Sequence, residues 1–163
     1  MEKALFGAGC FWGVEDFFRQ VPGVATAVSG YAGGTTQAPT YKQVCAGDTN
    51  HAEVVEVSFD PAAVSYETLV DLFFKMHNPT TRNRQGPDVG TQYRSVIFTH
   101  GPEQARIAAQ VRDRVAASGE WKAPVVTQIE DAPPFWPAED YHQRYFQKHG
   151  GSCHVSYADV ADN

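Results

Sequence analysis

The sequence predicts one mixed α/β domain that covers all 163 residues. Short apolar segments with the spacing of strands alternate, imperfectly, with segments that have the spacing of amphipathic helices. Glycine and proline separate these segments, and no repeat or low-complexity tract divides the chain. Because a chain of this length can bury a core without disulfides or metal, we expect a single layered α/β or α+β sheet protein.

The first half of the chain predicts strands joined by helices and loops. The expected strands cover residues 3–8, 24–31 and 53–59. An apolar series with helical spacing predicts a helix that begins near Phe11 and ends at Pro22-Gly23. A loop rich in glycine and threonine is expected at 33–40. Ser65 can cap the next helix, which has to stop before Asn78-Pro79 because a residue that precedes proline disfavours helix.

The second half begins with a long polar loop and then repeats the alternation. The expected elements are a strand at 94–99, a helix from Pro102 to Gly119, a strand at 125–129 and a proline-rich, aromatic turn at 132–137. A short helix carrying Tyr141 and Tyr145 follows, and a glycine pair then leads to Cys153.

Charge and composition exclude several classes of protein. The formal net charge is -6, and the scattered Lys and Arg residues number 13 against 19 Asp and Glu, so we expect neither a nucleic-acid partner nor an anionic membrane partner. No apolar run approaches the roughly 18 residues that span a bilayer, and the first residues do not resemble a signal peptide. Three cysteines leave at least one thiol free, which fits a reducing compartment and predicts a cytoplasmic protein.

Cys10 is the first candidate for chemistry. Gly7 and Gly9 break the first strand just before it, so the expected helix begins at the cysteine. The unpaired N–H groups of the first turn and the helix dipole would then favour the thiolate form. A nucleophilic thiol and a small buried apolar residue both suit this position. Phe11 can face the core, while Trp12 either lines a pocket beside the thiol or covers surface.

Glu53 is the second candidate. Alternation along the third expected strand places Glu53 on the same side as Val55, Val57 and Phe59. A carboxyl group that points toward an apolar layer acquires a raised pKa and can donate a proton near neutral pH. A glutamate at a strand end that reaches water is the alternative.

Several motifs place the chain in a known family. They are GCFWGVE at 9–15, SGYAGG at 29–34, PTYKQVC at 39–45, HAEVVEV at 51–57, GTQYRS at 90–95 and AEDYHQ at 138–143. In this order they resemble peptide methionine sulfoxide reductase A over nearly the whole chain. Asn50 stands where relatives often carry glycine, and asparagine also tolerates a left-handed backbone.

The resemblance implies thiol-dependent reduction of the S epimer of methionine sulfoxide, free or in proteins, and thus repair after oxidative stress. Sulfoxide oxygen is a poor leaving group, so a thiolate that attacks the sulfur needs an acid and hydrogen-bond donors at that oxygen. The family pattern implies Cys10 as the nucleophile, Glu53 as the proton donor, Tyr41 and Tyr93 as the hydroxyls that bind the oxygen, and Asp88 as the residue that orients this network. Without the resemblance, both tyrosines would be interpreted as covers of the core.

The resemblance also implies the substrate pocket and the recycling step. Phe11 and Trp12 would form the apolar pocket for the S-methyl group. The sulfenic acid left on Cys10 would condense with Cys153, which we expect on a mobile C-terminal tail at 149–163, although an incidental tail cysteine is the alternative. We interpret Cys45 as structural.

The family implies a ferredoxin-like two-layer sandwich, with helices packed on a mixed sheet and irregular coil at the ends. It implies no bound metal or organic cofactor and thioredoxin as the external reductant, and we expect a monomer. The cysteines and histidines lack the Cys-x-x-Cys and His-Glu-x-x-His spacings of common zinc sites. A thiol peroxidase and a non-catalytic module that binds methionine-containing peptides are the other functional classes that would keep Cys10 accessible.

Overall fold

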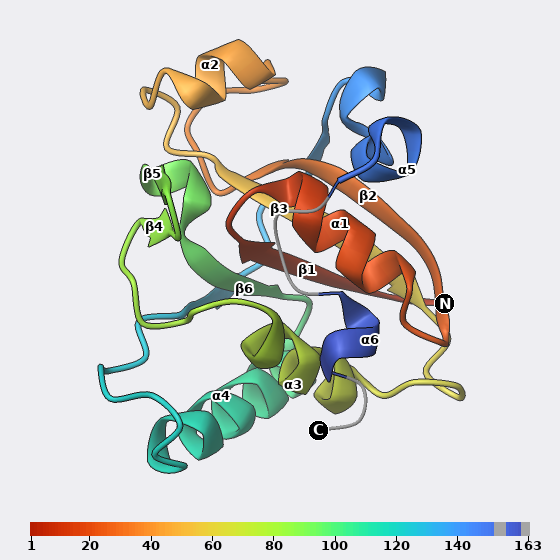
Figure 1. The fold of residues 1–163 in the computed structure, drawn as a ribbon, viewed down its shortest axis with the longest axis vertical. Helices are drawn as coiled ribbons and strands as arrows, with labels where there is room; N and C mark the ends of the chain where they lie inside the picture. Colours follow the sequence, from red (N-terminus) through yellow and green to blue (C-terminus); the bar gives the residue numbers. More distant parts are fainter. Residues whose placement is uncertain (152–155, 161–163) are drawn as a thin grey trace.

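The computed structural model describes residues 1–151 and 156–160. Its centre is a six-stranded sheet with the order β7-β6-β1-β3-β2-β8 (Figure 1). The strands are β1 (Glu2–Ala8), β2 (Val24–Ala32), β3 (Ala52–Phe59), β6 (Ser95–Thr99), β7 (Gln128–Asp131) and β8 (Trp136–Pro137). β7 pairs parallel to β6, and the other pairs in this sheet are antiparallel. The mixed sheet expected from the family resemblance is therefore confirmed.

Three longer helices accompany the sheet: α1 (Phe11–Arg19), α3 (Tyr66–Met76) and α4 (Pro102–Ala117). The strand order β6-β1-β3-β2, with α1 joining β1 to β2 and α3 following β3, is the ferredoxin-like arrangement. Ser65 caps α3, because its hydroxyl accepts a hydrogen bond from the N–H of Thr68 at 3.0 Å. The predicted start and stop of this helix are thus confirmed.

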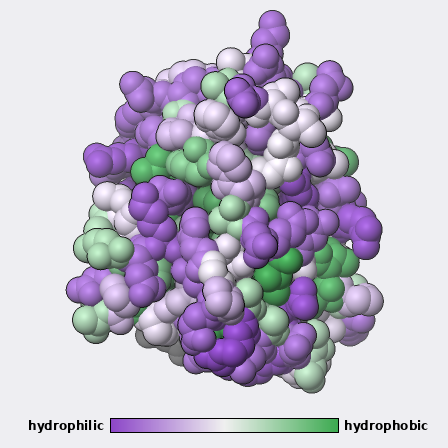
Figure 2. Space-filling view, turned by 180° about the vertical axis from the view of Figure 1, so that it is seen from behind, coloured by the Kyte–Doolittle hydropathy of each residue, from purple (hydrophilic) through white to green (hydrophobic). Residues whose placement is uncertain are grey.

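Alternate side chains of β1 pack on opposite sides of the sheet. Phe6 belongs to the main core beneath the helices, and its ring lies 5.0 Å from that of Phe18 in α1 and 5.3 Å from that of Phe73 in α3. Leu5 belongs to a smaller cluster on the other side, against which Phe135 of a coil segment packs. Figure 2 shows the molecule from behind, with hydrophilic residues surrounding small hydrophobic patches. The helices therefore cover one face of the sheet, and coil covers much of the other.

Short elements interrupt the loops that the sequence predicts. A helix, α2 (Tyr41–Cys45), begins after Thr40, whose hydroxyl accepts a hydrogen bond from the N–H of Gln43 while the Gln43 side chain accepts one from the N–H of Thr40. The long polar loop contains a hairpin of β4 (Arg84–Gln85) and β5 (Asp88–Val89), followed by the 3-10 turn η1 (Thr91–Tyr93). These elements were not expected from the periodicity.

Two expected elements differ from the structure. The strand expected at 125–129 begins at residue 128, because the N–H of Val126 donates to the carbonyl of Pro79 at 2.8 Å instead of joining the sheet. The prediction of a single helix that carries both Tyr141 and Tyr145 is wrong. It is divided into η2 (Asp140–His142) and α5 (Tyr145–His149), because Arg144 adopts a left-handed backbone with φ 54°.

The end of the described chain packs against the helices. α6 (Tyr157–Val160) buries Val160, and the ring of Tyr157 lies 6.3 Å from that of Phe17 in α1. Cys153 lies outside the described residues. Asn50 has φ 59°, the left-handed conformation expected for it. Within residues 1–151 and 156–160, no helix has both the length and the apolar character needed to cross a membrane.

Candidate active site

Cys10 lies at the start of α1, as the sequence predicts. It is the N-cap residue, and its carbonyl accepts the N–H groups of Gly13 at 3.2 Å and Val14 at 3.4 Å. Gly9 precedes it with φ 95°, a conformation that glycine adopts without strain and that turns the chain from β1 into α1. The cysteine is half-buried and does not belong to the apolar core. The interpretation of Cys10 as a small core residue is therefore wrong.

Glu53 lies beside the same helix end. Its Oε1 atom accepts the backbone N–H of Phe11 at 3.1 Å, although the side chain comes from the distant strand β3. The residue is 1% exposed, and its Oε2 atom has no hydrogen-bond partner among the described residues. The alternative in which this glutamate reaches water is therefore wrong.

The surroundings of Glu53 favour its protonated form. Burial is the largest cause that raises its pKa well above the ordinary value, followed by the negative charge of Cys10 and then that of Asp88. The hydrogen bond from the Phe11 N–H acts in the opposite direction but does not reverse the shift. A carboxyl group that stays neutral can donate a proton to a group bound beside Cys10.

Tyr41 and Tyr93 lie on two short elements, near enough to Glu53 for its charge to influence them. Tyr41 begins α2 and Tyr93 ends η1, and both are half-buried. Burial is the main cause that raises the pKa of each hydroxyl, and Glu53 in its ionised form raises it further; for Tyr41 the neighbouring Cys45 also contributes. Both hydroxyls consequently remain protonated at neutral pH and can act as hydrogen-bond donors.

Asp88 acts on this site through its charge. It is half-buried in the hairpin strand β5, and its carboxylate raises the pKa of Glu53 and of Tyr93. Among the described residues, no hydrogen bond joins Asp88 to either active-site tyrosine. The structure therefore brings Asp88 near the network, and its influence there is electrostatic.

Phe11 and Trp12 have different environments on α1. Phe11 is fully buried, whereas Trp12 is half-buried and packs against residues near the C-terminus. Trp12 Nε1 donates a hydrogen bond to His142 Nδ1 at 2.9 Å. The indole also stacks on Tyr145, with ring centroids 3.7 Å apart and planes 5° apart. Trp12 is thus held in one orientation beside Cys10, as a pocket wall requires.

His142 and Glu139 are site residues that the sequence reasoning missed. His142 is fully buried, its ring lies 4.3 Å from that of Tyr41, and burial lowers its pKa while the charge of Glu139 opposes that shift. Glu139 accepts the N–H of Tyr41 at 3.0 Å and the hydroxyl of Tyr31 at 2.9 Å. Both lie in the AEDYHQ motif, which is the signal that could have identified them.

Glu15 connects α1 to the segment that carries these residues. Its Oε1 atom accepts the N–H of Arg144 at 2.6 Å and the hydroxyl of Ser29 at 3.4 Å, and the side chain is 1% exposed. Burial raises the pKa of Glu15, although the hydrogen bond from the Arg144 N–H, the charge of Arg19 and the hydrogen bond from Ser29 lower it in part. Glu15 thus holds the left-handed turn at Arg144 that sets the position of Tyr145 against Trp12.

Cys45 does not have the environment expected of a structural cysteine. It ends α2 and is exposed, whereas the neighbouring Val44 takes the buried position of this helix. Partial burial is the largest cause that raises the pKa of its thiol, and the neighbouring Tyr41 hydroxyl opposes this shift. The interpretation of Cys45 as a packed apolar residue is therefore wrong, because α2, which was not expected, turns its side chain outward.

The described residues contain no group of three or more His, Cys, Asp or Glu side chains that could hold a metal ion.

The family model described as peptide methionine sulfoxide reductase matches residues 2–163. The chain is 58% identical to the peptide methionine sulfoxide reductase MsrA of Methanoculleus marisnigri over 151 residues, which cover 93% of this chain and 92% of that protein.

Solved structures of similar proteins share the fold. Methionine sulfoxide reductase A of Corynebacterium diphtheriae aligns with a TM-score of 0.82 and 41% identity over 93% of this chain and 77% of that one. Mxr1 from Saccharomyces cerevisiae in reduced form aligns with a TM-score of 0.87 and 36% identity over 93% and 87% of the two chains. Mxr1 is also known in complex with Trx2, and that structure aligns with a TM-score of 0.65 and 24% identity over 95% and 88%.

Proposed function

The chain belongs to the peptide methionine sulfoxide reductase family and reduces methionine sulfoxide, and we propose that Cys10 is the nucleophile of this reaction. The observation that carries the proposal is the contact between Glu53 Oε1 and the N–H of Phe11 at 3.1 Å. A buried carboxyl group with a raised pKa therefore lies beside the residue that follows the thiol. A nucleophile and a proton donor therefore share one end of α1.

In the first step the Cys10 thiolate attacks and the sulfoxide oxygen is transferred. The sulfur of Cys10 gains the oxygen and becomes a sulfenic acid, while the substrate sulfur gains two electrons and leaves as the thioether of methionine. Glu53 supplies the proton that the oxygen acquires, and the hydroxyls of Tyr41 and Tyr93 hold that oxygen by hydrogen bonds. Support comes from their raised pKa values, which favour the protonated form of all three groups.

Phe11 and Trp12 form the apolar wall that receives the S-methyl group, in this proposal. Support comes from the fixed orientation of Trp12 between His142 and Tyr145. A methyl group offers only shape and apolar surface for recognition, so a rigid aromatic wall suits it. The reductases of methionine sulfoxide each act on one epimer, and the proposal assigns the S epimer to this chain.

In the second step the thiol of Cys153 attacks the sulfenic acid. The Cys10–Cys153 disulfide forms and water leaves, so atoms and electrons balance. Cys153 lies outside the described residues, and the proposal requires segment 149–163 to bring it to Cys10. Thioredoxin then reduces the disulfide. Support comes from Mxr1, which is 36% identical to this chain and is known in complex with Trx2.

The proposed setting is the repair of oxidised proteins by a cytoplasmic monomer that needs no bound cofactor. A disulfide that thioredoxin has to reduce in every cycle requires a reducing compartment. The three cysteines and the acidic composition agree with this setting.

One experiment tests both steps together. Free thiols are counted before and after a single turnover with each epimer of a methionine sulfoxide peptide, while mass spectrometry follows the loss of oxygen from the peptide. The S epimer should consume two thiols in the unmodified protein and none in Cys10→Ser. Cys153→Ser should complete one turnover and then stall with thioredoxin, whereas Cys45→Ser should behave like the parent. Sustained thioredoxin-driven turnover in Cys153→Ser would exclude that cysteine as the resolving residue.

A further inference from the structure

One edge of the sheet is open beside the proposed active site. β8 covers the outer edge of β2 at Gly30 and Tyr31. At Ser29 the side chain of Gln143 replaces a strand: Ser29 N donates to its Oε1 at 2.9 Å, and its Nε2 donates to the Ser29 carbonyl at 2.9 Å. From Ala25 to Val28, no strand of the described chain pairs with this edge.

The backbone of Ala27 continues the ladder that Gln143 ends. Outward-facing N–H and C=O groups recur at every second residue of a strand, and Ser29 directs both of its groups toward Gln143. Ala27 is therefore the next residue whose N–H and C=O face away from β3. Among the described residues, the Ala27 N–H and C=O groups have no hydrogen-bond partner across this edge. An unpaired edge of this kind is a template for an added strand.

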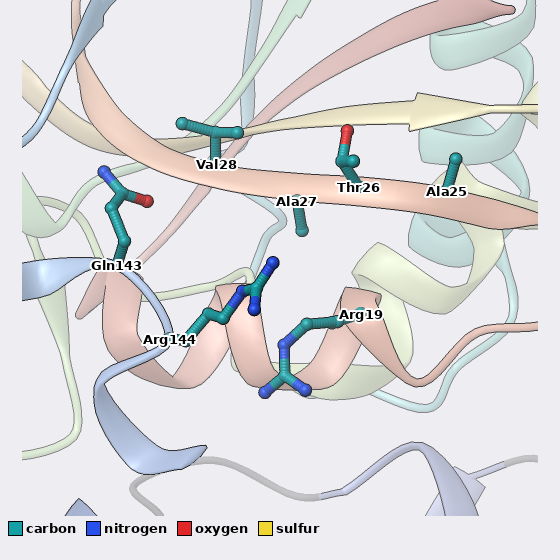
Figure 3. Close-up of a pocket in the computed structure, with 7 residues that line it drawn as sticks. All are labelled: Arg19, Ala25, Thr26, Ala27, Val28, Gln143 and Arg144. Atoms are coloured by element: carbon teal, nitrogen blue, oxygen red, sulfur yellow. The ribbon is translucent and has the colours of Figure 1, made fainter. Parts of the chain in front are cut away.

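A cavity with a positive charge lies along this edge. Its volume is about 220 Å³, and it lies between β2 at 25–28, Arg19 of α1, and Gln143-Arg144. Figure 3 shows the Arg144 side chain reaching beneath Ala27, whereas the Arg19 guanidinium turns away from β2. Arg19 is held by Asp16 at 2.8 Å and lies 3.5 Å from Glu15. Arg144 is exposed and forms no ion pair with the part of the chain that the structure describes.

We propose that the open edge of β2 at Ala27, together with Arg144, binds an extended acidic segment of the substrate polypeptide. The proposal rests on the proposed function and adds a preference among protein substrates. An extended segment can pair with the Ala27 N–H and C=O groups, as in other cases where a peptide adds a strand to a sheet. A carboxylate of that segment can pair with the Arg144 guanidinium. The nearby acids Glu15 and Asp16 are already engaged with Arg19 and the Arg144 N–H.

The substrate is the favoured occupant because the segment that lines this edge also holds a wall of the proposed methyl pocket. Arg144 directly precedes Tyr145, which stacks on Trp12 at 3.7 Å. Tyr31, whose ring lies 5.6 Å from that of Phe11, lies four residues from Ala27 along β2, a distance of about 13 Å. An extended chain advances about 3.3 Å per residue, so the acidic residue should lie about four residues from the methionine sulfoxide.

The test uses blocked peptides that contain methionine S-sulfoxide, with two acidic residues centred four positions to its N-terminal or C-terminal side. Matched peptides carry alanine or lysine there, and free methionine sulfoxide serves as the reference substrate. One of the two acidic placements should raise kcat/KM about two- to fivefold over alanine at low ionic strength, and salt should remove this gain. Arg144→Gln should lose the gain, Arg144→Lys should keep most of it, and Arg106→Ala, an exposed arginine on α4, should keep all of it.

Free methionine sulfoxide should be reduced equally by all these variants, which shows that each is folded and active. Proline at alternate positions of the acidic segment removes the N–H groups needed for the ladder and should also abolish the gain. The inference is overturned if the unmodified protein shows no acidic preference, if Arg144→Gln retains it, or if proline has no effect. It is also overturned if Arg144→Gln lowers the acidic preference only when thioredoxin is the reductant, or only because it dissociates a dimer. Failure to reduce free methionine sulfoxide would instead contradict the proposed function.

Discussion

Glutamine in place of Glu53 removes the proposed proton donor and preserves the shape of the site. Glutamine Oε1 can still accept the N–H of Phe11, which Glu53 accepts at 3.1 Å. We expect the rate of oxygen removal in a single turnover to fall by about 100-fold or more, because a positioned general acid contributes roughly 10²–10⁴. A 100-fold loss corresponds to about 2.7 kcal/mol of transition-state stabilisation.

The same substitution should make the folded protein more stable than the parent as the pH rises. Burial, and then the charges of Cys10 and Asp88, raise the pKa of Glu53, so the folded protein binds this proton more tightly than the unfolded chain does. The contribution of Glu53 to stability is therefore full below its unfolded pKa of about 4.3 and is lost as pH rises toward the raised value. The loss reaches about 1.4 kcal/mol per pH unit in that window, and glutamine does not share it because it does not titrate.

Urea unfolding across this pH window measures the stability, and rapid-quench mass spectrometry measures the single-turnover rate. Glu56→Gln is the matched control, because Glu56 lies in the same strand but is paired with Lys3 at 3.3 Å. It should change the rate and the pH dependence little. An unchanged rate in Glu53→Gln would refute the assignment of Glu53 as the acid. A stability difference from the parent that does not vary with pH would refute the raised pKa.

Three further predictions concern the packing that supports the site. His142→Ala leaves the Trp12 N–H, now bonded at 2.9 Å, without its acceptor, and should raise KM by roughly five- to a hundredfold, while Trp12 fluorescence reports the loosened ring. Glu15→Ala leaves the N–H of Arg144 without the carboxylate that accepts it at 2.6 Å, and should lower the free energy of unfolding by about 1–3 kcal/mol in urea; Glu15→Gln, which keeps an acceptor, should lose clearly less. Gly30→Ala places a methyl group against the Phe135 ring and the Trp136 carbonyl, and should cost about 1–3 kcal/mol in the same assay; a stability equal to that of the parent would contradict the close packing at β8.

Local patterns in the sequence predicted the larger elements well. The helix that begins after Cys10 and the helix capped by Ser65 follow from apolar spacing and from the residues at their ends. The short elements did not follow, because a five-residue helix such as α2 and the two-residue strands of the hairpin carry too little periodicity. The broken helix at Arg144 depends on Glu15, a residue far away in the sequence, and no local signal announces it.

The residues of the candidate site were likewise predicted in part from local sequence patterns. Two glycines before an apolar helical series were enough to place Cys10 at a helix end, and alternation was enough to turn Glu53 inward. The roles assigned to Tyr41, Tyr93 and Asp88 came from the family resemblance. Cys45 was misinterpreted because its exposure depends on which side of α2 meets the core.

The sequence by itself determined the class of fold, the family and the candidates for the nucleophile and the acid, because these depend on motifs and on spacing within single elements. Only the tertiary structure decided how the site is held together and where the sheet is left open. Trp12 meets His142 across 130 positions of sequence, and Gln143 meets Ser29 across 114. Contacts of that separation form only when the sheet and helices have packed, so no pattern within one segment contains them.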